Sequence, residues 1–309
     1  MGAILSKGAC MRQWFLALLI VAATSPAHAG ASGVFAEDVL TIDMRRLPFM
    51  HLKDPQNAFQ DTVKVRPARI HVNGGIPLKM GWTELFIGAD YEILPFTYDG
   101  WDFTQETFRV DSLQSLSLDL RLRQKFSDDL AVRVHTMPGV FSDFHDVTSR
   151  SARLQGGVAL EKTFLGIFTV GAGVESTTAF GTRKVVPMLT AQMKSRYFRA
   201  EGSLPTNMEV YFIPSDKFEV GIKGSVTGGN YRLEEGGAFK GNNVRYSVGT
   251  LGPSLNVKFS KHLTWSLDGG TTFLHSFSTF DSDTNVRDFD LKHAMYLMSG
   301  LKFGFGGRG

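Results

Sequence analysis

The end of the chain alternates between two kinds of side chain, and this alternation restricts the fold more than any other feature of the sequence. From Phe289 to Phe305, seven of the nine odd positions hold a large apolar residue, whereas most even positions hold a charged residue, a tyrosine or a glycine. A period of two residues is that of a β-strand with one apolar face. The run therefore predicts one long terminal strand that is apolar on one face along its whole length.

The same period recurs along most of the chain after residue 60. Leucine occupies every second position from Leu116 to Leu122, and the intervening residues are serine, aspartate and arginine. Candidate strands run for about 10 to 17 residues, longer than the ~5–6 residues typical of soluble β-domains and enough for the ~9–11 residues of a tilted transmembrane strand. The pattern predicts an all-β fold, an antiparallel transmembrane β-barrel. A secreted soluble β-barrel is the less favoured alternative.

The average composition agrees with such a barrel. The chain of 309 residues is 43% apolar, and its mean hydropathy is −0.06. A transmembrane barrel strand exposes only one face to lipid, so a near-neutral average is expected. The 25 phenylalanines often fall at the ends of predicted strands, where aromatic girdles meet the membrane interface. The net charge of +3 is small and scattered, which indicates no nucleic-acid partner.

The first 29 residues have the pattern of a secretory signal peptide. Lys7 and Arg12 precede a short apolar run, Trp14–Ala23, and Ala27–Ala29 form an A-x-A site. This order of regions predicts cleavage after Ala29. We then expect an N-terminal segment at residues 30–60, with one early strand in one of the two strand counts below, and the barrel at residues 61–305. The expected location is the outer membrane, in contact with its lipid.

Turn signals give two alternative strand counts. Short connections are expected near residues 127–129, 165–166, 194–196, 214–216 and 260–262. Long polar connections are expected near residues 99–112, 141–151, 176–184, 227–243 and 276–288. Bacterial barrels place short turns on the periplasmic side and long loops outside. The two kinds alternate strictly if residues 197–213 are two strands broken at Pro205, because proline cannot donate to a ladder. The barrel then has 14 strands, including Val39–Arg46. If residues 197–213 are instead one unbroken strand, the barrel has 12 strands.

Residues of about 60 to 305 resemble a domain-of-unknown-function family of bacterial outer-membrane β-barrels. The resemblance depends on the segments 123–130, 138–144, 153–157 and 228–233. The most specific is the loop motif, which comprises Pro138, Gly139, Phe141, Ser142, Asp143 and Phe144. The resemblance implies a fold and a location, and it carries no activity or catalytic residues. Separately, the terminal strand with its aromatic end resembles the signal read by the barrel assembly machinery, which we expect as a partner during biogenesis.

The sequence does not favour an enzyme. Ser142, Asp143, His145 and Asp146 are the residue types of a hydrolase, but catalysis requires a nucleophile and a base in contact. Consecutive residues of a loop do not provide that geometry, and we interpret 138–146 as a polar loop in which Pro138–Gly139 ends a strand. Residues 281–285 lack half of a calcium-loop pattern. We therefore expect no catalytic, cofactor-binding or metal-binding residues, and no cofactor.

The polar phase of the predicted strands identifies side chains that are expected to face the lumen. They include Asp119, Arg121, Arg123, Arg133, Arg153, Glu161, Glu219 and Lys223. Both signs of charge are present, whereas a strongly ion-selective pore usually shows one sign at its constriction. The sequence leaves two functions open. One is a narrow, porin-like channel for small solutes or ions, and the other is a plugged structural or adhesive barrel with binding loops. An outer-membrane enzyme is less favoured than either.

Overall fold

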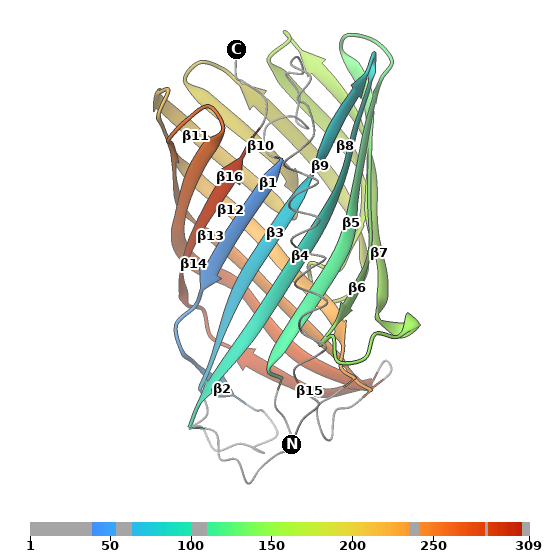
Figure 1. Cartoon of the computed structure of the whole chain (residues 1–309), viewed down its shortest axis with the longest axis vertical. Coiled ribbons are helices and arrows are strands. Elements are labelled where there is room, and N and C mark those ends of the chain that lie inside the picture. Colours follow the sequence, from blue (N-terminus) through green and yellow to red (C-terminus); the bar gives the residue numbers. More distant parts are fainter. Residues whose placement is uncertain (1–38, 54–63, 101–109, 235–240, 282–283, 305–309) are drawn as a thin grey trace, which may run out of the picture.

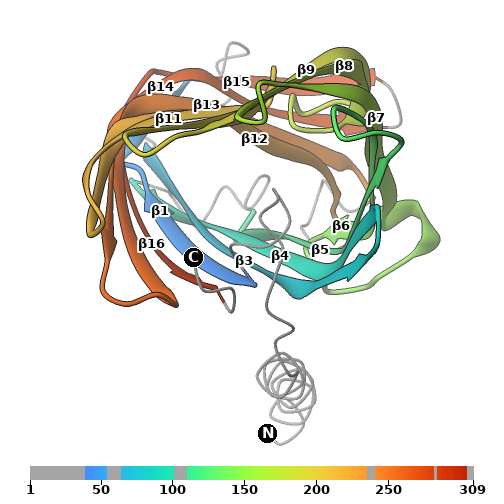
Figure 2. The same cartoon turned by 90° about the horizontal axis from the view of Figure 1, so that it is seen from above.

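The computed structural model describes residues 39–53, 64–100, 110–234, 241–281 and 284–304. The predicted signal peptide at 1–29 lies outside these residues. The described chain forms a closed β-barrel of antiparallel strands, seen from the side in Figure 1 and along its axis in Figure 2. Within the same residues, no helix is both long and apolar enough to cross a membrane.

The wall is built from sixteen strand segments. In chain order they are β1 (Leu40–Arg46), β2 (Met50–Lys53), β3 (Lys64–Met80), β4 (Thr83–Asp99), β5 (Ser112–Lys125), β6 (Leu130–Ser142), β7 (Ala152–Phe164), β8 (Phe168–Thr177), β9 (Lys184–Lys194), β10 (Phe198–Leu204), β11 (Asn207–Ser215), β12 (Phe218–Arg232), β13 (Asn243–Lys258), β14 (Leu263–Asp281), β15 (Thr284–Leu291) and β16 (Met295–Phe303). One short 3-10 helix, η1 (Ser149–Ser151), precedes β7.

The barrel has 14 strands, one of the two predicted counts. Strands β1 and β2 are two parts of one interrupted strand beside β3, and β15 and β16 are likewise two parts of one strand beside β14. Pairing of β1 with both β16 and β3 closes the ring. The early strand that the higher count required is β1, so the barrel wall begins at Leu40.

The break at Pro205 decides between the two counts. Strand β10 ends at Leu204 and β11 begins at Asn207, and the two pair as an antiparallel hairpin. The Leu204–Pro205 peptide bond is cis. Pro205 lies in the turn, where its missing N–H interrupts no ladder. The 12-strand alternative is therefore wrong.

The predicted alternation sorts side chains to the two faces of the wall. On β5, Leu116, Leu118 and Leu122 are exposed on the outside, whereas Ser117 and Asp119 between them are buried on the inside. The same outward apolar face recurs on β7, β9, β11 and β12. A closed barrel with an apolar exterior satisfies its backbone groups and presents lipid-compatible side chains. The chain is thus an outer-membrane β-barrel.

The terminal strand differs from its prediction. It is interrupted at residues 292–294, between β15 and β16. Phe289 and Leu291 point inward and are 3% and 4% exposed, whereas Met295 and Leu297 point outward and are 75% and 60% exposed. The apolar residues keep odd numbers through the break, but their face changes from the lumen to the lipid. The expectation of one continuous apolar face was wrong, because an interruption in the strand reverses which face the odd positions occupy.

The two ends of the barrel differ in their connections. Short turns join β3 to β4, β5 to β6, β7 to β8, β9 to β10, β11 to β12 and β13 to β14 at one end. The described chain also starts and finishes at that end, where Val39 N–H donates to Phe303 O at 2.8 Å. By the rule for bacterial barrels this end faces the periplasm. The long connection expected near 276–288 is absent, because β14 and β15 continue as a paired hairpin through most of that range.

Candidate functional site in the barrel interior

The outer half of the lumen is filled by apolar side chains. We call this cluster the septum, and its members are Val65, Leu94, Phe96, Val110, Leu113, Phe141, Tyr231, Leu233, Val244, Tyr246, Val248, Phe277, Phe289 and Leu291. They come from β3–β6 and β12–β15 and from residues next to these strands. Each is buried, so the septum is packed like a protein core and not like the lining of a pore.

Ring contacts in the septum cross the lumen. Phe96 on β4 lies edge-on to Tyr246 on β13, with centroids 5.8 Å apart, and 5.5 Å from Phe277 on β14. Phe141 on β6 lies 5.6 Å from Tyr231 on β12. Strand β4 is separated from β13 and β14 by several strands of the ring. The Phe96 contacts therefore join facing walls and obstruct the axial path at the outer half, whereas Phe141 and Tyr231 lie on strands that are neighbours at this level.

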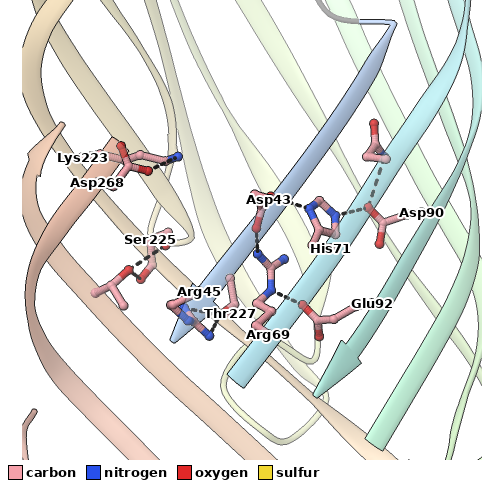
Figure 3. Close-up of polar contacts among 12 residues, drawn as sticks. Asp43, Arg45, Arg69, His71, Asp90, Glu92, Lys223, Ser225, Thr227 and Asp268 are labelled. Atoms are coloured by element: carbon pink, nitrogen blue, oxygen red, sulfur yellow. Dashed lines mark hydrogen bonds and ion pairs between the residues drawn. The ribbon is translucent and has the colours of Figure 1, made fainter. Parts of the chain in front are cut away.

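A buried polar layer lies next to the septum on its periplasmic side, and Figure 3 shows the side chains of Asp43, Arg45 and Arg69 that belong to it. Tyr231 donates its hydroxyl hydrogen to Glu92 at 3.0 Å, which ties β12 to β4. Arg69 on β3 bridges the carboxylates of Asp43, at 2.9 Å, and Glu92. Arg45 on β1 reaches across the lumen to the hydroxyl of Thr227 at 3.3 Å. Each charge in this layer has a partner, as the low dielectric of a buried site requires.

His71 extends this layer toward the periplasm. Its Nδ1 lies 2.8 Å from Asp43 and its Nε2 lies 2.6 Å from Asp90, so both ring nitrogens face a carboxylate (Figure 3). Asn73 donates to Asp90 and to Asp119, each at 3.1 Å. Strands β1, β3, β4 and β5 are thereby linked through their inward side chains. Such cross-strand polar pairs stabilise a sheet and also narrow a lumen.

Two further charge clusters line the inner half. Glu161 on β7 is 1% exposed and accepts from Arg123 at 2.8 Å and from Arg133 at 2.7 Å. Arg199 on β10 contacts Glu209 at 2.8 Å and Glu219 at 3.0 Å. These groups fix one another, because a guanidinium can donate to two carboxylates in defined directions.

The structure places each charged residue of the sequence prediction. Asp119 and Arg121 pair along β5, and Lys223 pairs with Asp268 at 3.0 Å. Arg123, Arg133, Glu161 and Glu219 belong to the two clusters above. Arg153 lies elsewhere, at the outer end of β7, where it donates to the carbonyl oxygen of Asn230 at 3.2 Å.

Several interior charges were absent from the sequence prediction. They are Asp43, Arg45, Arg69, His71 and Arg199. The signal for Arg69 and His71 was present, since both sit on the same phase of β3. The opposite phase carries Ile70, Val72, Ile76, Leu78 and Met80, but before Ile70 it holds Lys64, Arg66 and Ala68, so the alternation covers only part of β3.

Two polar cavities occupy the lumen on the periplasmic side of the septum. The first has a volume of about 630 Å³ and is lined by the periplasmic turns at Asp128 and Lys194 as well as by His71 and Asp90. The second has a volume of about 410 Å³ and lies toward β7–β11. Arg121, Gln192, Glu201 and Lys302 line both cavities. The two are therefore adjoining parts of one charged space that begins at the periplasmic end.

The loop motif is largely strand, contrary to its interpretation as a surface loop. Strand β6 continues through Pro138 and Gly139 to Ser142. A Cβ on Gly139 would lie 2.1 Å from Ser117 Oγ and 2.8 Å from Leu116 O. Only glycine fits there, because a side chain would overlap the neighbouring strand β5. The Pro138–Gly139 pair thus allows a close strand contact instead of ending the strand.

The rest of the motif joins β6 to β12. Ser142 pairs with Arg232 in parallel, and Asp143 N–H donates to Arg232 O at 3.2 Å. Asp143 Oδ2 accepts from the N–H of Glu234 at 3.0 Å, and Ser142 Oγ accepts from the N–H of Phe144 at 2.9 Å. Phe144 has a positive φ of 59°, in the left-handed region that a turn tolerates. The side chains of Ser142 and Asp143 thus stabilise the junction between β6 and β12.

Two other segments of the resemblance, 153–157 and 228–233, meet at the same junction. Arg153 contacts Asn230 on β12. A Cβ on Gly228 would lie 2.3 Å from Tyr246 O and 2.6 Å from Ala179 O. Motifs far apart in the chain therefore converge where β12 leaves the β11 side and crosses to β6. At this level β6 contacts β12 directly, while the outer ends of β7, β8 and β9 lie on the outward face of β12.

The chain is similar to several solved structures. They include the COG4313 outer membrane channel from Pseudomonas putida F1, with 9% identity, 91% of this chain and 99% of that chain covered, and a TM-score of 0.41. LpxR from Salmonella typhimurium has 11% identity, 86% and 99% coverage and a TM-score of 0.37. The P. putida toluene transporter TodX has 8% identity, 88% and 91% coverage and a TM-score of 0.35.

At the level of sequence, no curated protein matches the chain. A family model does match, over residues 94–304, which is more than half of the chain. This range contains the loop motif, the β6–β12 junction and most of the wall. The chain belongs to the family described as Domain of unknown function (DUF6268).

Proposed function

We propose that the protein is a narrow outer-membrane channel for small polar solutes and ions. The observation that carries this proposal is the pair of adjoining polar cavities, about 630 and 410 Å³, that begins at the periplasmic end. Side chains fill the lumen of small barrels, and wide aqueous channels belong to barrels of 16 or more strands. A 14-stranded barrel with a cavity of this size supports a restricted path.

The charges of the cavity wall indicate what it accepts. Arg121, Lys125 and Lys302 contribute positive charge, and Asp128, Asp129 and Glu201 contribute negative charge. A lining with both signs does not repel either ion type as a single-sign ring would. We therefore expect weak selectivity between small anions and cations, with size as the main restriction.

A plugged structural barrel is the second candidate, and the septum favours it. Aromatic contacts of Phe96 across the lumen obstruct the axial path, and the polar layer next to them is held by fixed pairs. A barrel with that function would conduct nothing. The two functions therefore differ in a single measurable property.

Conductance of the purified, refolded barrel in a planar lipid bilayer tests the proposal. We expect unitary steps well below those of a 16-stranded general porin, because the lumen is narrowed by side chains. The matched control is the same preparation after heat denaturation, which removes the barrel but keeps the detergent. Absence of steps from protein that shows the heat-modifiable gel mobility of a folded barrel would refute the channel and leave the plugged barrel.

A further inference from the structure

The outward face of β3 changes from apolar to cationic toward the outer end of the barrel. Leu78, near the periplasmic turn, and Ile70 are both exposed on this face. The strand between them is roughly 26 Å long, so it crosses most of the ~25 Å apolar band of a membrane barrel. Arg66 lies on the same phase of β3, beyond Ile70. The Arg66 side chain therefore lies at the level of the lipid headgroups of the outer leaflet.

A second arginine, Arg46, lies beside Arg66 at the end of β1. Strands β1 and β3 are neighbours in the wall (Figure 1), and Arg46 pairs with Ala68. Arg66 is the diagonal neighbour of Arg46 on the same face, at a backbone separation of roughly 7–8 Å. Ile42 and Met44 precede Arg46 on the outward phase of β1 and are exposed to lipid. Two guanidinium groups thus project from adjacent strands into one headgroup layer.

No carboxylate forms an ion pair with either arginine within the part of the chain that the structure describes. Arg46 lies opposite Leu297 on β16. Arg66 lies opposite Thr97 on β4. An arginine side chain stays charged at any pH a cell experiences. The outer surface here therefore carries two positive charges without an acidic neighbour directly opposite them.

Phe49 holds Arg66 at the surface. The Cζ atom of Arg66 lies 4.3 Å from the centroid of the Phe49 ring, and Phe49 is 40% exposed. A cation over a ring face is attracted to it without any carboxylate. Farther out on β3, Lys64 lies opposite Asp99, and these two charges balance each other. The unbalanced charge at this level is that of Arg46 and Arg66.

We propose that Arg46 and Arg66 bind the phosphate group of a lipid in the outer leaflet of the membrane. A guanidinium group donates two parallel hydrogen bonds to phosphate oxygens. The acyl chains of the same lipid lie on the exposed apolar side chains next to the arginines, which are Met44, Ile70 and Leu297. A free phosphate ion lacks this second contact. The site lies on the outer surface of the wall, so it does not depend on the proposed channel function.

Native mass spectrometry of the purified, refolded barrel in detergent tests the site. The probe is lipid A with two phosphate groups, and the fraction of barrel that carries one lipid A is measured for the wild type and for Arg46→Gln/Arg66→Gln. The matched control is Arg196→Gln. Arg196 is exposed at the periplasmic end and also lies over an aromatic ring, that of Tyr197, at 5.3 Å. Phosphatidylcholine, which has no net charge, is the comparison lipid.

We expect the double substitution to weaken lipid A binding about tenfold, because charge-assisted hydrogen bonds to phosphate are lost. Arg196→Gln should change it by less than about twofold, and phosphatidylcholine should bind the wild type and the double variant alike. Equal affinity of the wild type and the double variant for lipid A would overturn the proposal, as would an equal loss in Arg196→Gln.

Inorganic phosphate separates a lipid site from a site for the free ion. An excess of phosphate should displace no more lipid A from the wild type than sodium chloride of the same ionic strength does. Stronger displacement by phosphate would overturn the assignment to a lipid. If the double variant lacks the heat-modifiable mobility of a folded barrel, Arg46→Gln alone replaces it, with an expected loss of about threefold. Unchanged lipid A binding in that variant would contradict the site.

Discussion

Replacing Phe96 and Tyr246 together by serine is expected to raise the conductance of the barrel severalfold. The two rings meet across the lumen with centroids 5.8 Å apart, and a buried aromatic side chain occupies about 150–250 Å² of contact surface. Serine removes both rings and supplies hydroxyl groups that water can solvate. An alanine pair would leave an apolar cavity, and such cavities stay dry. A wetted septum opens a wider axial path.

The control for this change is Phe212→Ser. Phe212 is 48% exposed on the outside of β11 and packs against Phe198, so the same chemical change is made on the lipid face. We expect its conductance to equal that of the wild type. Conductance of the double variant equal to that of the wild type would show that the septum is not the axial barrier.

Replacing Glu161 by alanine is expected to lower the free energy of unfolding by about 3–5 kcal/mol. The carboxylate is 1% exposed and is shared by Arg123 and Arg133 at 2.8 and 2.7 Å. Its removal leaves two guanidinium groups inside the wall without the carboxylate they share. Breaking a buried pair from one side is strongly destabilising, because an uncompensated buried charge remains. Equilibrium unfolding in urea from lipid vesicles measures the loss.

Glu201→Ala is the matched control for this loss. The Glu201 side chain is 41% exposed in the lumen and lies 3.4 Å from Arg199. A partly solvated ion pair contributes less than about 1 kcal/mol. Equal losses for Glu161→Ala and Glu201→Ala would contradict the assignment of Glu161 as the shared buried partner. Glu161→Gln should fall between the two, since the amide oxygen still accepts a hydrogen bond but carries no charge.

The fold was predictable because alternate residues of a barrel strand face the lipid and the lumen. Leucines at every second position of β5 face lipid and the residues between them face the lumen, so the period alone identifies the strand. The turn at Pro205 was predictable as well, because proline breaks a ladder. From these two signals the closed barrel and one of two strand counts followed.

The septum was not predictable, because its strands are apolar on both faces. On β4, Leu94 and Phe96 point inward, while the half-buried Ile93 and the exposed Ile87, nearer the periplasm, lie on the opposite phase of the strand. Alternation disappears where the interior is itself apolar. The reversal of faces between Leu291 and Met295 was hidden for a related reason, since the odd numbering of the apolar residues continues across the break.

The β6–β12 junction was hidden by distance along the chain. Ser142 and Arg232 lie 90 residues apart in sequence and pair in parallel. No local sequence pattern predicts a contact between such distant residues. The Pro138–Gly139 pair resembled a turn signal. The need for glycine came instead from Ser117 on the neighbouring strand. The role of the motif was therefore assigned to the wrong kind of structure.

The crossing of β12 to β6 also determines how the axial path could open. The septum is part of the barrel wall, since its aromatic rings project from strands that are hydrogen-bonded to their neighbours. A plug formed by a separate domain inside a barrel can leave the lumen as one rigid body. Here the axis opens only if rings change rotamer in place or if β12 detaches from Ser142 and Asp143 and swings outward. The first movement belongs to side-chain motion, and the second to the slower rearrangement of strands.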